Sequence, residues 1–351
     1  MTRQQKLLLV RMDKLGDLVL SLPVDQAPIA TMADVTWLVS QGTGFIAAAA
    51  VPPRRFFEMP KGFSWRNLFT LVRWLRAQNF YAAVVLYAPW WIGLALWIAQ
   101  VPTRVGRVSQ WHSFLFFNRG VRQSRKGGQR HETDDNLTLL QTGLMRPTLN
   151  RAEQVHQASV TAVEPLRLKA PSALLQDWSL TAQGYYVVHP GMAGSALNWP
   201  TSCYAELIRE LIKIKPVVIT GTKTDAAHLK PLQENLAAHA SSEVIWLNEK
   251  LNSAQLLTIL MTAQAVIAPS TGVLHLAAAL GTPVVGLYSP LPVQRPTRWG
   301  PRGQQVVTLV SPATEAEALV DPTRAMGRIR VQDVLQALNQ FKVGTSSELS
   351  P

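Results

Sequence analysis

The amino-acid sequence predicts an α/β fold made of two Rossmann-like, doubly wound domains. Short apolar runs alternate with stretches in which apolar residues recur at helical spacing, and this alternation is typical of βαβ units around a parallel sheet. The pattern runs twice along a chain of 351 residues, which is long enough for two cores of ordinary size. Hydrophobic residues make up 47% of the chain and charged residues 16%, a composition that excludes disordered and fibrous proteins.

The first series of elements fills the N-terminal half. Its expected strands are the runs KLLLVRM, VTWLVS and AAVVLY, and a helix is expected at 64–78, where apolar side chains fall on one face. The uncharged stretch 81–101 is long enough to span a bilayer. It divides at Ala88-Pro89, however, and we interpret it as a buried strand followed by an apolar helix that starts after the proline.

The second series follows a mixed, proline-containing segment at 148–182. Its strands are expected at YYVV, PVVITG, SEVIWL, AVIAPS and PVVGLYSP, with helices at YAELIRELIKI, SAQLLTILMTA and VLHLAAALG. We predict an N-terminal domain at 1–165, a C-terminal domain at 166–325, a final helix at 326–343 and a disordered tail at 344–351. Two such sheets are expected to face each other across a cleft at the carboxyl ends of their strands, where α/β folds bind ligands.

Basic residues are concentrated in the N-terminal half. Residues 1–165 carry 19 lysines and arginines against 10 acidic residues, whereas the rest of the chain carries 15 against 12. This imbalance indicates an anionic partner, for which nucleic acid, a membrane surface and a phosphorylated substrate are candidates, with ordinary surface charge as the alternative. The single cysteine excludes an intrachain disulfide, and the N-terminal apolar run is too short for a signal peptide, so we expect a cytoplasmic protein.

Three loops, each after an expected strand, carry the candidate functional residues. The first, RMDKLGD, has Gly16 for a tight turn and Asp17 at the start of the next element. Asp17 is placed to act as a general base on an attacking hydroxyl, with Asp13 as a weaker candidate. The alternative is that Asp17 only stabilises the start of a helix.

The second loop, HPGMAGSALNWP, suits contact with phosphate oxygens. His189, Gly191 and Ser195 lie where a strand ends and a helix approaches, and glycines allow the backbone to come close to a ligand. The loop matches neither the dinucleotide fingerprint nor the Walker pattern.

The third loop, PSTGVLH, leads into a short apolar helix. Ser270 and Thr271 are expected to cap this helix, whose first N–H groups near Gly272 favour a phosphate. His275 follows one turn later on the same side as Thr271. The alternatives are capping alone for the hydroxyls and a core position for the histidine.

Taken in order, these loops resemble glycosyltransferase family 9, the heptosyltransferases of lipopolysaccharide core synthesis. The matching segments are LLLVRMDKLGDLVLSLP, His-Pro-Gly at 189–191 with Trp-Pro at 199–200, and AVIAPSTGVLHLAAALGTPVVGLYSP, with shorter matches at Arg104-Val-Gly106, His131–Leu137 and Arg298-Trp-Gly-Pro301. The resemblance runs from about Lys6 to about Pro301. It implies a GT-B fold and inverting transfer of heptose from ADP-heptose, with the donor on the C-terminal half and a lipid A-linked acceptor on the N-terminal half.

The resemblance also implies roles for individual residues. Asp17 would activate the acceptor hydroxyl, and the residues expected to hold the donor are His189, Gly191, Ser195, Ser270, Thr271, Gly272 and His275. No metal and no cofactor beyond the ADP-heptose co-substrate is implied, because helix-end N–H groups and side chains can stabilise the leaving diphosphate. Asp134 and Asp135 are interpreted as acids at a helix start rather than as metal ligands.

The chain departs from the family pattern at two positions. Leu197 stands where members that use ADP-heptose commonly have lysine, and Ser270 stands where many have aspartate. Candidates to supply the missing cation are Arg11, Lys14, Lys223 and Arg298. Two alternatives therefore stay open: a non-catalytic relative that binds a nucleotide sugar or glycolipid, and a transferase or epimerase that uses another nucleotide sugar.

A lipid A-linked acceptor is polyanionic and lies at the inner face of the cytoplasmic membrane, so the resemblance gives the basic half a partner. The residues expected to contact the acceptor are Lys14, Arg119, Arg122, Arg125, Lys126 and Arg130. We expect peripheral contact with the anionic membrane face and no nucleic-acid partner, because no aromatics are interleaved in this cluster at a stacking spacing. Trp65, Phe69 and Trp74 are expected to pack in the core, with insertion into lipid as the alternative.

Overall fold

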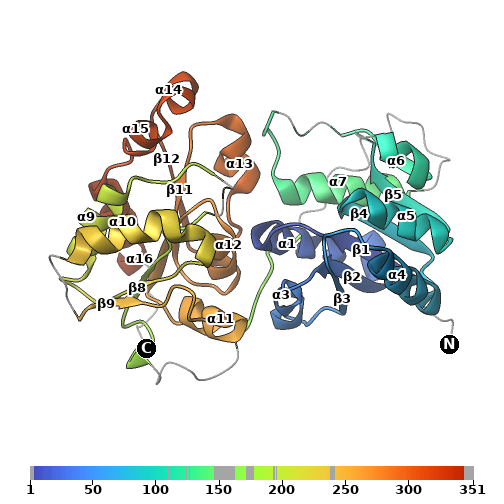
Figure 1. The fold of residues 1–351 in the computed structure, drawn as a ribbon, viewed down its shortest axis with the longest axis horizontal. Coiled ribbons are helices and arrows are strands. Elements are labelled where there is room, and N and C mark those ends of the chain that lie inside the picture. The colour runs from blue at the N-terminus through green and yellow to red at the C-terminus, as the bar shows by residue number, and fades with distance from the viewer. Residues whose placement is uncertain are drawn as a thin grey trace. The chain divides into compact units, whose positions relative to one another are not determined.

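The computed structural model describes residues 4–108, 111–123, 125, 127–145, 163–170, 178–192, 194, 196–237 and 242–343. The chain folds into two compact units, residues 1–166 and 167–351, which we call unit 1 and unit 2 (Figure 1). The tail predicted at 344–351 and most of the segment 148–182 lie outside the described residues, as do Lys126 and Ser195.

Unit 1 is built on a six-stranded sheet with the order β3-β2-β1-β4-β5-β6. Its strands are β1 (Lys6–Arg11), β2 (Asp34–Ser40), β3 (Phe56–Met59), β4 (Ala82–Tyr87), β5 (Thr103–Arg107) and β6 (Arg119–Val121). All neighbouring strands run parallel. The chain leaves β1 in one direction across the sheet and returns to β4 on its other side, so β1 and β4 flank the switch point at which doubly wound sheets bind ligands.

Helices make every connection in this sheet, as the alternating pattern predicts. Between β1 and β3 lie α1 (Leu15–Ser21), the 3-10 helix η1 (Leu22–Gln26), α2 (Pro28–Thr31) and α3 (Gly44–Ala49). Between β3 and β6 lie α4 (Trp65–Gln78), α5 (Trp90–Ile98) and α6 (Trp111–Phe116), and α7 (Glu132–Leu144) follows β6. α4 contacts α5 and α5 contacts α6, whereas α7 contacts α1 (Figure 1).

The helix expected at 64–78 is confirmed as α4. Ser64 caps its start by accepting a hydrogen bond from the backbone N–H of Asn67 at 3.1 Å. Asn79, with a left-handed φ of 54°, ends it. The buried side chains are those that share one helical face in the sequence, namely Leu68, Leu71, Val72 and Leu75.

The expectation that three aromatic residues of α4 pack in the core is wrong for two of them. Trp65 and Phe69 lie outside the face of the buried leucines and are 65% and 66% exposed. Trp74 is partly buried and stacks on Phe57, with 4.3 Å between the ring centroids. The large apolar ring alone does not bury a residue; the helical position does.

The uncharged stretch 81–101 is a strand followed by a helix, as predicted. It forms β4 and then α5, and Pro89 stands immediately before the first helical residue. Across the described ranges, no helix combines the length and the apolar character that a membrane crossing requires.

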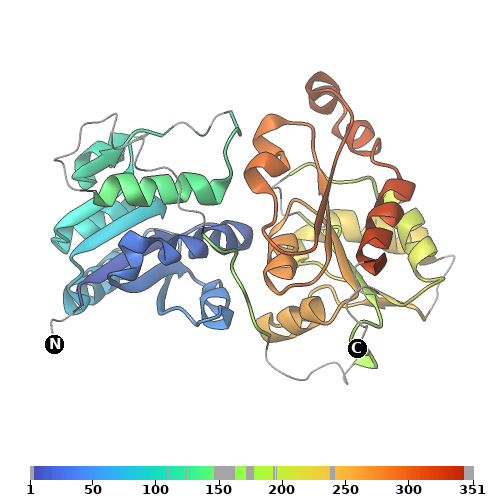
Figure 2. The same cartoon turned by 180° about the vertical axis from the view of Figure 1, so that it is seen from behind.

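Unit 2 repeats the architecture with the strand order β12-β11-β10-β7-β8-β9. Its strands are β7 (Tyr186–Val188), β8 (Val217–Ile219), β9 (Val244–Trp246), β10 (Ala265–Pro269), β11 (Val284–Tyr288) and β12 (Val306–Val310), all paired in parallel. The five expected strands are present, and β12 was not among them. Figure 2 shows helices on both sides of this sheet.

The helices of unit 2 include those expected, whereas the 12-residue helix at 226–237 and several short helices were not expected. They are α9 (Thr201–Leu211), η3 (Lys223–Asp225), α10 (Ala226–Ala237), α11 (Ser253–Met261), α12 (Gly272–Ala279), η4 (Pro292–Gln294), α13 (Pro296–Trp299), α14 (Glu315–Val320), α15 (Pro322–Met326) and α16 (Val331–Val343). The final helix, expected at 326–343, is α16. Its Val334, Ala337 and Leu338 belong to the same buried cluster as β7 and β8, so α16 is part of the core of unit 2.

Candidate active site

Asp17 lies in the first turn of α1, just after the carboxyl end of β1 and therefore at the switch point of unit 1. The N-cap residue of α1 is Lys14, whose side chain makes no capping hydrogen bond. The Asp17 carboxylate instead binds the guanidinium of Arg11, with 2.5 Å between Oδ1 and Nη2. Helix capping alone does not account for Asp17, because its carboxylate has a charged partner on the adjoining strand.

Arg11 is the centre of a buried ionic group, which we call the Arg11 cluster: Arg11, Asp13, Asp17, Arg125 and Glu132. Arg11 is 2% exposed, and its Nη atoms lie 3.5 Å from Asp13 and 2.9 Å from Glu132 in addition to Asp17. Glu132, the first residue of α7, also accepts a hydrogen bond from Arg125 at 2.5 Å. The cluster sets two arginines against three carboxylates, so negative charge is in excess.

Burial and the neighbouring charges shift the pKa values of the two central groups. Burial raises the pKa of Asp17 above its usual value, and the neighbouring Asp13 and Glu132 raise it further, against the opposing effect of Arg11. Burial alone lowers the pKa of Arg11, but Asp17, Glu132 and Asp13 together raise it, so Arg11 stays charged. Asp17 is thus an ionisable carboxylate with more affinity for a proton than an ordinary surface aspartate has.

The sequence did not predict Glu132 as a site residue, nor that Arg11 would bind the carboxylates of unit 1. Arg11 was considered only as a cation for the donor, and Glu132 lies 121 residues further along the chain. The pairing of the end of β1 with the start of α7 depends on the sheet order, which no local spacing reveals. The one available signal was that His131–Leu137 matches the family at a helix start rich in acids.

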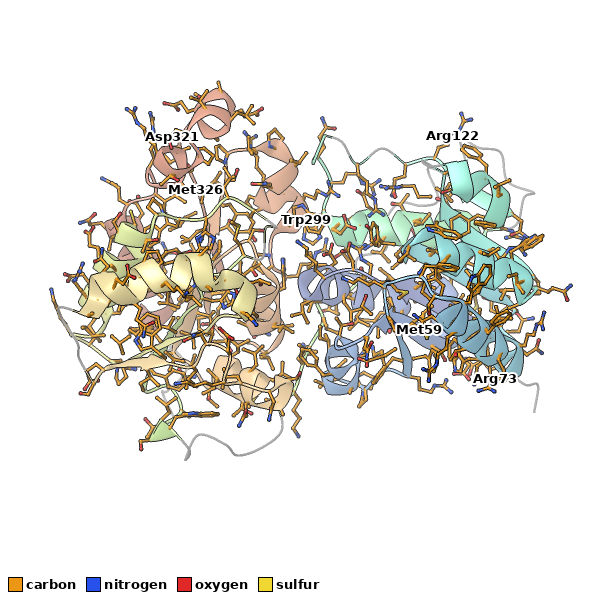
Figure 3. All side chains as sticks on the ribbon, in the orientation of Figure 1. Met59, Arg73, Arg122, Trp299, Asp321 and Met326 are labelled. Atoms are coloured by element: carbon orange, nitrogen blue, oxygen red, sulfur yellow. The ribbon has the colours of Figure 1, made fainter. Side chains whose placement is uncertain are left out.

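Three of the six basic residues predicted to bind the acceptor make contacts within unit 1. Arg125 donates to Glu132, Asn136 and Gln123. Arg119 lies 3.3–3.4 Å from the last carbonyls of α7, where a cation is favoured by the helix dipole. Arg130 donates to Thr138 at 2.8 Å. Lys14 and Arg122 are exposed (Figure 3 labels Arg122).

A pocket lies beside the Arg11 cluster, at the carboxyl ends of β4 and β5. Its lining includes Tyr87, Trp90 and Arg107 together with Ser113 and Phe117. The guanidinium of Arg11 lies 5.8 Å from the centre of the Tyr87 ring, so this tyrosine borders both the cluster and the pocket. Arg107 and the aromatic rings suit a substrate that is both anionic and rich in sugar rings, and none of these residues was predicted.

In unit 2, His189 follows β7 and is buried, with 4% of its surface exposed. Its Nδ1 lies 2.9 Å from the hydroxyl of Thr220. Burial lowers the pKa of His189 to about 4, against the opposing effect of nearby Asp225. At neutral pH this side chain is therefore an uncharged imidazole that can orient a ligand by hydrogen bonding and brings no positive charge.

Only a glycine fits at position 191, because the carboxylate of buried Asp225 lies against its Cα. Asp225 was not among the residues predicted from the sequence. A Cβ on Gly191 would lie 2.3 Å from the carboxyl carbon of Asp225 and 2.5 Å from both its oxygens. Asp225 cannot easily retreat, because its Oδ2 accepts hydrogen bonds from the backbone N–H and hydroxyl of Thr222 at 2.9 and 2.7 Å. The loop is closed on its other side by Asn198, whose amide donates to the carbonyl of Pro190 at 2.7 Å.

Gly191→Ala is expected to lower the free energy of unfolding by about 1–3 kcal/mol, because the new methyl group overpacks a fixed carboxylate. Urea denaturation measures this loss. Gly62→Ala is the matched control, since a Cβ on Gly62 meets nothing within 4 Å. A Gly191→Ala protein as stable as the control variant would contradict the argument.

The third loop joins β10 to α12. Thr271 is the N-cap residue of α12, but its side chain makes no capping hydrogen bond, so the expectation of hydroxyl capping is wrong for this residue. The Ser270 side chain hydrogen-bonds with Tyr288, whose hydroxyl in turn donates to the carbonyl of Trp299 at 2.8 Å. Ser270 therefore ties this loop to β11 and α13. His275 is buried one turn into α12, beside Thr271 in helical position.

Leu197, like Ser270, departs from the family pattern and has contacts within unit 2. Leu197 packs against the apolar cluster of Ala313, Ala318 and Ala325, and its backbone N–H donates to Gln294 at 3.3 Å. Of the candidate replacement cations, Arg11 is held in its own cluster. Lys223 is exposed in η3, and the guanidinium of Arg298 lies 4.7 Å from the centre of the Trp299 ring.

Within the described ranges, no group of three or more histidine, cysteine, aspartate or glutamate side chains is arranged to hold a metal ion. Asp134 and Asp135 lie in the first turn of α7, which confirms their interpretation as acids at a helix start.

Comparison with known proteins gives the family. The sequence model of glycosyltransferase family 9 (heptosyltransferase) matches residues 68–328. A provisionally named glycosyltransferase of Haemophilus influenzae is 27% identical over 308 residues, 85% of this chain and 86% of that protein. Lipopolysaccharide heptosyltransferase 2 of Salmonella typhimurium is 32% identical over 125 residues, which are 34% of this chain and 35% of that protein.

Solved structures share the whole architecture. The ADP-heptose lipopolysaccharide heptosyltransferase II of Escherichia coli superposes with a TM-score of 0.78 at 19% identity, covering 98% of this chain and 100% of its own. A family 9 glycosyltransferase of Veillonella parvula superposes with a TM-score of 0.76 at 16% identity, covering 97% of each chain. The two parallel sheets thus form a GT-B fold. With the family model matched along most of its length, this chain belongs to glycosyltransferase family 9, the heptosyltransferases, and is a glycosyltransferase.

Proposed function

We propose that this enzyme transfers heptose from ADP-heptose to a lipid A-linked lipopolysaccharide core acceptor, with inversion at the anomeric carbon. The observation that carries the proposal is Asp17, a carboxylate of raised pKa at the switch point of unit 1, bordered by the pocket of Tyr87 and Arg107. The printed name of the Escherichia coli neighbour supports ADP-heptose as the donor, and that of the Salmonella relative supports lipopolysaccharide as the pathway.

In the proposed reaction, Asp17 takes the proton from the acceptor hydroxyl as its oxygen attacks C1 of the heptose. The bond from C1 to the β-phosphate oxygen breaks, and ADP leaves with the electron pair. A base is most effective when its pKa approaches the working pH, so the burial that raises the pKa of Asp17 favours proton transfer. Arg11 holds the carboxylate in position while the proton moves.

Unit 2 supplies the proposed donor site. The leaving diphosphate would lie at the N-terminal end of α12, where Thr271 and Gly272 begin the helix and the helix dipole favours negative charge. His275 and the neutral His189 would add hydrogen bonds to this diphosphate. Such groups stabilise the charge that develops on ADP, so the proposal requires no metal and no further cofactor.

Donor preference tests the proposal directly. Calorimetric titration of the protein with ADP-heptose, ADP, UDP and a UDP-sugar is expected to rank ADP-heptose and ADP above both uridine ligands. Incubation with ADP-heptose and a truncated lipopolysaccharide is expected to release ADP only when the acceptor is present. Preference for a uridine nucleotide would move the enzyme to another sugar, and conversion of donor without acceptor would indicate an epimerase.

A non-catalytic binder is the second candidate, and Leu197 favours it because no cation occupies that position. This candidate predicts donor binding with no product formed from any acceptor.

The cytoplasmic side of the inner membrane is the proposed location of the enzyme, since both substrates are proposed to be available there.

A further inference from the structure

One long segment of unit 1 has an unusual composition. Residues 59–131 contain no aspartate or glutamate, since Glu58 and Glu132 are the acids that flank it. The same segment carries 11 lysines and arginines, and it holds 6 of the 11 tryptophans and 6 of the 10 phenylalanines of the chain. A core needs aromatic residues, but it does not need the exclusion of every acid from the surrounding surface.

The structure places several of these aromatic side chains outside the core. On α4, Trp65, Phe69 and Arg73 recur at spacings of four residues, so they share one face of the helix. That face adjoins the buried one but points away from the core, and Trp65 and Phe69 are 65% and 66% exposed. Arg66 and Arg73 are exposed beside them, and Figure 3 labels Arg73 on this helix.

The neighbouring helix continues the same surface. Trp90 and Trp97 of α5 are seven residues apart, which is two helical turns, and they are 41% and 54% exposed. Phe63, in the loop before α4, joins the two helices: its ring centroid lies 5.3 Å from that of Trp65 and 5.3 Å from that of Trp90. We call Phe63, Trp65, Phe69, Trp90 and Trp97 the aromatic face. Beyond α5, α6 adds exposed Phe114 and Leu115.

We propose that the aromatic face, with Lys61, Arg66 and Arg73, docks unit 1 on an anionic lipid bilayer. Tryptophan and phenylalanine favour the interface between headgroups and acyl chains, and arginine and lysine bind anionic headgroups. The absence of acids from the segment that carries this face favours attraction to a negative membrane. Among the described residues, the strongly exposed aromatic side chains all lie in unit 1, whereas the strongly exposed large apolar residues of unit 2 are aliphatic.

The position of the face within unit 1 fits a lipid-linked acceptor, and this step rests on the proposed function. Trp65 and Trp90 are the first residues of α4 and α5, so they follow the carboxyl ends of β3 and β4. Asp17 follows the carboxyl end of β1 in the same parallel sheet, and therefore lies at the same edge. Trp90 belongs both to the aromatic face and to the pocket beside the Arg11 cluster. A sugar chain rising from the docked bilayer would meet this edge.

Flotation with vesicles tests the docking with the full chain. Wild type is expected to float with vesicles rich in phosphatidylglycerol and much less with phosphatidylcholine alone. Arg66→Gln with Arg73→Gln is expected to reduce the partition coefficient about thirtyfold at low salt. Trp65→Ser with Phe69→Ser is expected to reduce it at least about tenfold at both low and high salt, because the apolar contribution is not screened.

The matched control is Leu319→Ser with Val320→Ser, which removes two apolar side chains of unit 2 that are 72% and 87% exposed. This control is expected to float like wild type. The proposal is overturned if the aromatic variant floats like wild type, or if it changes only self-association, as measured by light scattering.

Transfer to a delipidated, soluble core acceptor separates this inference from the proposed function. All docking variants are expected to keep that activity and to lose activity on acceptor embedded in vesicles. A wild-type protein that transfers heptose but never floats would overturn the docking alone. One that floats but transfers nothing would overturn the proposed function alone.

Discussion

Asp17→Asn is expected to lower turnover by about 10²–10⁴-fold while leaving the affinity for ADP-heptose within about twofold. The amide cannot accept the proton of the acceptor hydroxyl, yet it keeps the size of the carboxylate and an oxygen for Arg11. Donor affinity is unaffected because the proposed donor site belongs to unit 2. Initial rates of ADP release and calorimetric titration with ADP-heptose measure the two quantities on one preparation.

Thermal unfolding of the same variant provides its control. Because the folded-state pKa of Asp17 is raised, its ionisation opposes folding: the stabilising contribution is present at low pH and is lost as pH rises through that pKa. Asp17→Asn is therefore expected to be no less stable than wild type at neutral pH. Asp13→Asn changes the carboxylate that is the weaker candidate for the general base, and this variant is expected to retain most activity. Equal losses in the two variants would remove Asp17 as the base.

Arg11→Met is expected to have the largest effect on stability, a loss of about 3–5 kcal/mol in the free energy of unfolding at neutral pH. The side chain is 2% exposed and is shared by Asp13, Asp17 and Glu132. Its removal leaves three carboxylates beside a single arginine, Arg125. Urea denaturation at several pH values measures the loss, which is expected to shrink as pH falls because the carboxylates are then protonated.

The control for this prediction is Arg130→Met, which removes an arginine that is 48% exposed and 3.8 Å from Asp135, and which is expected to cost about 0–1 kcal/mol. In Arg11→Met protein that remains folded, the pKa of Asp17 is expected to rise further, so the acidic limb of the pH–rate profile moves to higher pH. If the loss in the free energy of unfolding is independent of pH, Arg11 acts by packing and not by neutralising charge.

The sequence determined β1, β2 and β4 of unit 1 and five of the six strands of unit 2, because strands and helices depend on local periodicity. The short strands β3, β5 and β6, and β12 at the edge of its sheet, were not expected. Helix α4 is the clearest case, since the apolar spacing at 64–78 predicts which face is buried, and Ser64 stands at the position of the N-cap. The same locality explains Asp17 as a candidate: a glycine and an aspartate after a buried strand are visible without any other part of the chain. The matched motifs added the family, which the comparison with family models confirms.

Local patterns failed where a side chain had a choice of partners. Ser270 and Thr271 precede a helix, so capping was expected, but Thr271 makes no capping hydrogen bond and Ser270 is engaged by Tyr288 from the next strand. Arg125 was expected to contact the acceptor, yet it is held by Glu132 and Asn136. Trp65 and Phe69 were expected in the core and are exposed.

The sequence by itself therefore determined the fold class, the positions of most of the longer elements and the identity of the Asp17 loop. Only the tertiary structure decided that Arg11 and Glu132, which are 121 residues apart, share a buried cluster, and that Asp225 lies against Gly191. The physical reason is that hydrophobic periodicity is read within one helix or strand. The pairing of charges and the packing of a carboxylate on a glycine depend instead on which strands become neighbours in the sheet.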